Sequence, residues 1–98
     1  MIKVRDYKNH KEVAAYLNEA LQDENPRAFL LALRTVAEAQ GGMSRLAQQS
    51  ELNRENLYRT LSLKGNPRFF NLLAMLKTFH LELFVRPKKN HLQDGTSD

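Results

Sequence analysis

Apolar residues recur every three or four positions along most of the chain, which is the pattern of amphipathic helices that bury one side. The first stripe predicts a helix from His10 to about Gln22, within a helical segment 10–24 that Asn9 can cap at its start. The inward positions of this helix are Val13, Tyr16, Leu17, Ala20 and Leu21.

A second stripe predicts a helix from Pro26 to about Gln40, because Asn25 can cap it and proline is well tolerated at a first helical position. The inward positions are Phe29, Leu30, Leu33, Val36 and Ala37. The glycine pair Gly41 and Gly42 ends this helix and opens the turn into the next element.

Two short helices joined by a tight turn are predicted over residues 44–62. Leu46 and Ala47 would pack the first helix, and Leu57 and Leu61 recur at four-residue spacing on the inner side of the second. This pattern is typical of a helix-turn-helix motif, whose second helix enters the DNA major groove.

The turn between these two helices holds a strong capping residue and one unusual residue. Asn53 can accept hydrogen bonds from the free N–H groups at the start of the second helix. Glu51 stands where many helix-turn-helix motifs carry a glycine, and a left-handed conformation there would cost about 1–2 kcal/mol. A turn of different construction is therefore the alternative.

The side of the second helix that lies opposite Leu57 is polar. A helical wheel places Glu55, Tyr58, Arg59 and Ser62 there, with Arg54 near the boundary in the first turn. Such a face suits the major groove, where arginine can donate two hydrogen bonds to guanine. An ordinary helical hairpin is the alternative, because residues 55 and 59 are four apart and could pair with each other.

A fifth helix is predicted from Pro67 to His80. Its inward stripe consists of Phe69, Leu72, Leu73, Leu76 and Phe79. Phe70 and Met75 fall outside this stripe and indicate either a broad core or a contact surface. A broad core is the better explanation in a five-helix domain of this size.

After the fifth helix the hydrophobic period changes to two, which predicts a strand over residues 81–86. One face of this strand would carry Leu81, Leu83 and Val85. A lone strand leaves its backbone groups unpaired, so it would either lie against its own helices or pair with a second copy or a partner. We therefore expect one all-α domain over residues 1–86 with a short C-terminal strand, and a disordered tail over residues 87–98.

Composition excludes several classes of protein. The chain of 98 residues has no cysteine, so it has no disulfide and no thiolate metal site. No apolar run approaches the roughly 18 residues of a membrane span, and no signal segment precedes the first helix, so we expect a cytoplasmic protein. His10, His80 and His91 are far apart and lack metal spacing, and catalytic motifs are absent. We expect neither a cofactor, nor a metal, nor an enzyme.

Positive charge is concentrated in the second half of the chain. Residues 1–42 carry six basic and six acidic side chains, whereas residues 43–89 carry nine basic and three acidic ones, a balance of +6. A local excess of this kind favours contact with phosphates and release of their counterions.

Four stretches together resemble the addiction-module antidote family, the HigA-like group of Cro/cI-type helix-turn-helix proteins. They are residues 14–21, 43–47, 52–62 and 65–69. The closing Leu-x-Leu-x-Val of residues 81–85 also fits, so that the resemblance covers about residues 5–86. It implies a five-helix, lambda-repressor-like domain that binds double-stranded operator DNA as a homodimer. It also implies that the protein neutralises a RelE-like, mRNA-cleaving toxin.

The resemblance also assigns roles to individual positions. Base contacts would be made by Arg54, Glu55, Tyr58 and Arg59, and phosphate contacts by Ser44 and Arg45. Asn53 and Ser62 complete the expected DNA-binding set, and Leu81, Leu83 and Val85 are the expected dimer or partner contact. Family members usually have glycine in place of Glu51 and often serine in place of Asn53.

Two alternatives to a DNA-binding antitoxin stay open. The first is a stand-alone helix-turn-helix regulator without a toxin partner. The second is a protein-interaction module that no longer binds DNA, which the basic balance of residues 43–89 disfavours.

Overall fold

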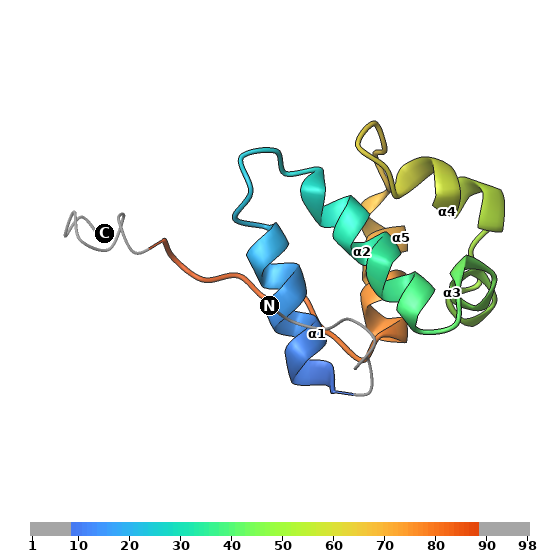
Figure 1. Ribbon diagram of the computed structural model, residues 1–98, viewed down its shortest axis with the longest axis horizontal. Coiled ribbons are helices and arrows are strands. Elements are labelled where there is room, and N and C mark those ends of the chain that lie inside the picture. The colour runs from blue at the N-terminus through green and yellow to red at the C-terminus, as the bar shows by residue number, and fades with distance from the viewer. Residues whose placement is uncertain (1–8, 89–98) are drawn as a thin grey trace.

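The computed structural model describes residues 9–88, and within them the chain forms five helices and no strand (Figure 1). The helices are α1 (His10–Ala20), α2 (Ala28–Ala39), α3 (Met43–Ser50), α4 (Arg54–Thr60) and α5 (Phe69–Thr78). α2 packs against α1 on one side and α3 on the other, and α3 in turn packs against α4 and α5. The predicted all-α class with five helices is confirmed for these residues.

One hydrophobic core joins all five helices. Its most deeply buried side chains are Leu33, Val36, Met43, Leu57, Leu61, Met75 and Phe79. Met75 therefore belongs to a broad core, as the size of the domain suggested, but this interpretation is wrong for Phe70, which is 78% exposed. Two predicted core positions are wrong, because Leu21 is 50% exposed beyond the end of α1 and Phe69 is 55% exposed at the first position of α5.

The helix starts follow local capping signals only in part. The side-chain oxygen of Asn9 accepts from the backbone N–H groups of residues 11 and 12, so the predicted cap of α1 is confirmed. Asn25 accepts from the N–H of Arg27, but the chain first makes a tighter turn in which Ala28 N–H donates to the Asn25 carbonyl, and α2 begins at Ala28. α5 also begins two residues after Pro67, because Arg68 is still extended.

The loop after α4 is fixed by a glycine. A Cβ at Gly65 would lie 1.8 Å from the carbonyl oxygen of Thr60, so no other residue fits without a shift of the backbone. Arg27, just before α2, donates from Nε to the Gly65 carbonyl at 3.1 Å. This hydrogen bond ties the loop after α4 to the residue that precedes α2.

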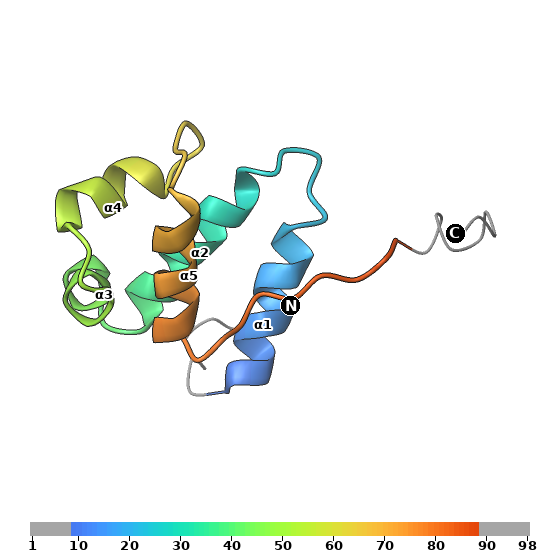
Figure 2. The ribbon, with the colours of Figure 1, turned by 180° about the vertical axis from the view of Figure 1, so that it is seen from behind.

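The strand predicted over residues 81–86 is not formed among the residues that the structure describes, and pairing of this segment with a second copy stays a prediction. His80 turns the chain at φ 63°, Leu81 N–H donates to the Leu76 carbonyl at 2.9 Å, and the segment then crosses α1 and leaves the helical body (Figures 1 and 2). No second strand exists within residues 9–88, so no ladder can form. Leu81 packs against the core, whereas Leu83 and Val85 are 50% and 88% exposed.

Some expectations fall on residues that the structure does not describe. They concern residues 1–8 of the domain, His91, and the tail from residue 89 onward. Among residues 9–88 no helix combines the length and the apolar character that crossing a membrane requires.

Candidate nucleic-acid interface

α3 and α4 are joined by a three-residue turn whose geometry is set by Glu51. This residue is left-handed, with φ 62° and ψ 35°, and follows the last residue of α3. The next N–H, of Leu52, donates to the Ala47 carbonyl at 2.9 Å. The turn therefore has the conformation that a glycine would favour, and the alternative of a differently built turn is wrong.

Asn53 ends the turn and begins α4. Its side-chain oxygen accepts from the backbone N–H of Asn56 at 3.0 Å, which confirms the predicted N-cap. Leu57 is 1% exposed and holds the inner side of α4 against the core. The other predicted α4 positions are therefore at the surface: Asn53, Arg54, Glu55, Tyr58 and Arg59 are all exposed.

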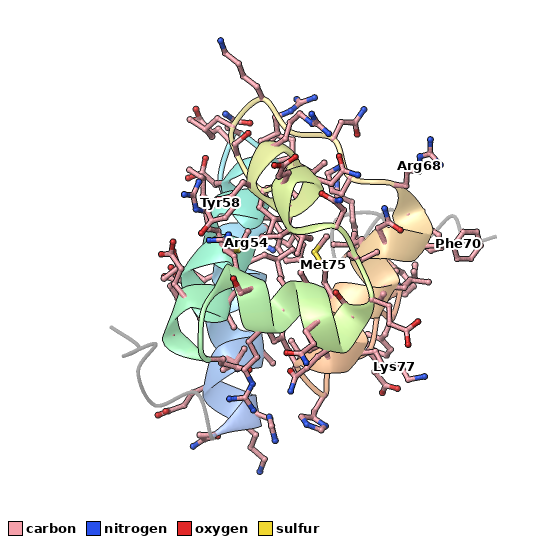
Figure 3. The ribbon with its side chains drawn as sticks, turned by 90° about the vertical axis from the view of Figure 1, so that its right-hand side faces the viewer. Arg54, Tyr58, Arg68, Phe70, Met75 and Lys77 are labelled. Atoms are coloured by element: carbon pink, nitrogen blue, oxygen red, sulfur yellow. The ribbon has the colours of Figure 1, made fainter. Side chains whose placement is uncertain are left out.

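One group of these side chains lies on the side of α4 that faces α2. The guanidinium carbon of Arg54 lies 5.5 Å from the centroid of the Tyr58 ring, and that of Arg34, from α2, lies 5.0 Å from the same centroid. Figure 3 shows Arg54 and Tyr58 together at this edge, and Arg68 and Phe70 on the opposite side. A guanidinium over an aromatic face is attracted to it electrostatically.

Asn56 and Thr60 lie on the side of α4 that faces the start of α5. Arg59 donates to the side-chain oxygen of Asn56, one turn earlier on α4. Ser62 lies just past the end of α4, half-buried, and its hydroxyl donates to the Arg59 carbonyl at 3.0 Å. A hollow of about 340 Å³ lies between Asn56 and Thr60 on one side and α5 on the other, and Arg68 lines it.

Ser44 and Arg45 are exposed in the first turn of α3, as a phosphate contact requires. The stem of Arg45 lies over Gly41, where a Cβ would meet it at 2.7 Å. Arg45 lines a groove between α3, the start of α1 and the end of α5, together with Lys77. No residue of α4 lines this groove.

Two of the three histidines meet in this same groove. The ring centroids of His10 and His80 are 4.8 Å apart, so the expectation that these residues are distant is wrong. Folding brings together the start of α1 and the end of α5, which sequence spacing does not reveal. Within residues 9–88 no three or more metal-binding side chains are grouped.

Two apolar surfaces lie outside α4. Phe69 and Phe70 pack edge to face at 5.4 Å in the first turn of α5, and Phe70 is 78% exposed. Residues 83–85 are exposed after the opposite end of this helix. Exposed apolar surface of this kind is typical of protein contacts.

Sequence reasoning missed Arg34, which lies on α2 and outside the predicted helix-turn-helix. Arg34 lies between the inward positions Leu33 and Val36, so the sequence indicates only that its side chain faces outward. The sequence could not show that this side of α2 meets α4.

Two comparisons relate the chain to known proteins. Residues 2–87 match the family model described as "Probable addiction module antidote protein". An uncharacterized protein of Haemophilus influenzae (strain ATCC 51907 / DSM 11121 / KW20 / Rd) is 36% identical over 81 residues, which are 83% of this chain and 82% of that protein. No solved structure matches the chain.

Proposed function

Because the chain belongs to the probable addiction module antidote family, we propose that it is a DNA-binding antitoxin. It binds and neutralises a RelE-like, mRNA-cleaving toxin, and it represses its own operon. Both activities are binding, and neither requires catalysis by this chain. Membership of an antidote family implies a toxin partner in general. The exposed surface of α4 supports the DNA-binding half of the proposal.

The observation that carries the DNA-binding half is the geometry of α3, the turn and α4. Glu51 adopts the left-handed conformation, Asn53 caps α4, and Leu57 turns one side of α4 into the core. The opposite side presents cationic and hydrogen-bonding groups. This arrangement supports a lambda-repressor-like helix-turn-helix in which α4 enters the major groove.

Base contacts come from the exposed side of α4, through Arg54, Glu55, Tyr58 and Arg59. Asn53 and Ser62 border this surface at the two ends of α4. Ser44 and Arg45 contact the phosphate backbone and set the orientation of the domain. A dimer places two copies of α4 in successive major grooves, about 34–36 Å apart.

The exposed segment after α5 supplies the contact between copies. Leu83 and Val85 lie on a stretch without backbone partners among residues 9–88, so a second copy can pair with it. Leu81 anchors the segment to the core. The toxin binds surface outside α4, so that the same protein holds toxin and operator.

The experiment that tests this function has two parts. Titrating the protein against a duplex from its own promoter and a scrambled duplex at one salt concentration measures sequence-specific binding. Co-expressing it with the neighbouring reading frame measures rescue of growth and protection of mRNA. Equal affinity for both duplexes would refute the proposed repression of its own operon.

The two parts also separate the alternatives. Specific DNA binding without rescue identifies a stand-alone regulator. Rescue without specific DNA binding identifies a protein-interaction module. Only the two results together support the antitoxin and autorepressor.

A further inference from the structure

Four side chains form a continuous row of contacts from α2 to α4. Glu38 Oε2 lies 3.5 Å from Arg34 Nε, and Arg34 lies over the ring of Tyr58, on which Arg54 also stacks. Arg34 and Glu38 are one turn apart on α2, and Arg54 and Tyr58 are one turn apart on α4. The row therefore links two rigid elements through the Tyr58 ring.

We propose that Arg34 is a positioning residue of the DNA-reading surface, which holds Tyr58, and through Tyr58 holds Arg54, in the arrangement that meets the bases. This inference rests on the proposed DNA binding. A free arginine samples many rotamers, and fixing it on binding costs conformational entropy. A side chain that is already ordered by its neighbours avoids much of that cost, so its contacts count more fully toward affinity.

The ring of Tyr58 is the centre of this arrangement. Two guanidinium groups share one electron-rich ring, and each is attracted to its face. Glu38 lies beside Arg34 and offsets part of the repulsion between the two guanidinium groups. Arg54 is left with the uncompensated charge, and it is the arginine that α4 carries in its first turn, where helices of this kind reach the base edges.

The environment of Arg34 favours positioning over direct phosphate contact. Its guanidinium already faces a carboxylate, and its side chain is 36% exposed while that of Glu38 is 56% exposed. A phosphate that approached Arg34 would meet the carboxylate beside it. The role of Arg34 is therefore exerted through Tyr58.

The test compares Arg34→Ala with two control variants. Arg34→Lys keeps a cation beside the Tyr58 ring. Lys11→Ala removes one positive charge from an exposed position of α1. We expect Arg34→Ala to weaken operator binding about 5- to 10-fold, with scrambled-duplex affinity changed less than about twofold and the slope of log affinity against log salt unchanged. We expect Arg34→Lys to keep most of the affinity and Lys11→Ala to leave the ratio of the two affinities unchanged. Circular dichroism confirms that each variant is folded.

Two results would overturn the proposal. Equal loss on both duplexes, with a salt slope flatter by about one unit, would make Arg34 a phosphate contact. No loss at all would make it a solvated surface charge.

A second measurement needs no DNA and separates this inference from the proposed function. NMR relaxation of the Arg54 Nε–H group in the free protein should show a restrained side chain, which Arg34→Ala releases and Arg34→Lys retains. Unchanged order of Arg54 in Arg34→Ala refutes the positioning role alone. A wild-type protein that does not distinguish operator from scrambled duplex refutes the proposed function instead.

Discussion

Replacing Glu51 with glycine should stabilise the protein. Glu51 is left-handed at φ 62° and ψ 35°, a conformation that costs a residue with a Cβ about 1–2 kcal/mol. Glycine removes this cost but gives back about 0.5–1 kcal/mol through the greater freedom of the unfolded chain. The net gain should be about 0.5–1 kcal/mol, which raises Tm by about 2–8 °C in a domain of this length. Thermal unfolding followed at 222 nm measures it.

The matched control for this prediction is Glu51→Ala. Alanine removes the same carboxylate but keeps a Cβ, so it retains the cost of the left-handed conformation and should leave Tm nearly unchanged. Glu51 lines the same groove as Arg45 and Lys77, and the control accounts for any loss of attraction to them. If alanine stabilised the protein as much as glycine, charge and not backbone conformation would be the cause. A glycine variant that unfolds earlier than wild type would refute the reasoning altogether.

Four further predictions concern single positions. Arg59→Ala should weaken operator binding by about 1–3 kcal/mol and spare non-specific binding, and equal loss on a scrambled duplex would make Arg59 a phosphate contact. Arg45→Ala should flatten the slope of log affinity against log salt by about one unit, and an unchanged slope would show that Arg45 does not contact the duplex. Gly65→Ala should cost at least about 1–3 kcal/mol in urea unfolding, because its Cβ would overlap the Thr60 carbonyl, and a neutral result would show that this loop can shift. Leu83→Pro should shift sedimentation toward monomer and weaken operator binding far more than it unfolds the domain, since Leu83 N–H donates no hydrogen bond within residues 9–88, and an unchanged species would exclude this segment as the dimer contact.

Hydrophobic periodicity predicted most of the helical core, with Leu21 and Phe69 as exceptions. The side chains of Leu33, Leu57 and Leu61 are buried as their spacing indicates, because any helix of a small domain must turn its apolar stripe inward. Caps were also readable when the signal was local, as at Asn9 and Asn53. The start of α2 could not be predicted in this way. The pair Asn25-Pro26 is compatible with both a helix start and a tighter turn, and tertiary packing decides between them.

The sequence predicted which side chains of α4 are exposed, but it did not predict their contacts with other elements. A helical wheel places Tyr58 and Arg59 opposite Leu57, and both are exposed. The wheel does not show that Tyr58 leans toward α2 to meet Arg34, nor that Arg59 is tied back to the preceding turn. These contacts depend on how α2 and α4 cross, which is fixed by side chains far apart in sequence.

The segment after α5 shows a different limit. Its period of two describes which side chains could share a face, but a strand exists only where a second strand satisfies its backbone. Within one chain that partner is missing from residues 9–88, so Leu83 and Val85 are left exposed on an unpaired backbone. The alternating pattern of residues 81–86 is therefore compatible with strand pairing, but a second chain must supply the pairing strand. A second copy of the protein carries the same segment, and the two segments can pair about a two-fold axis.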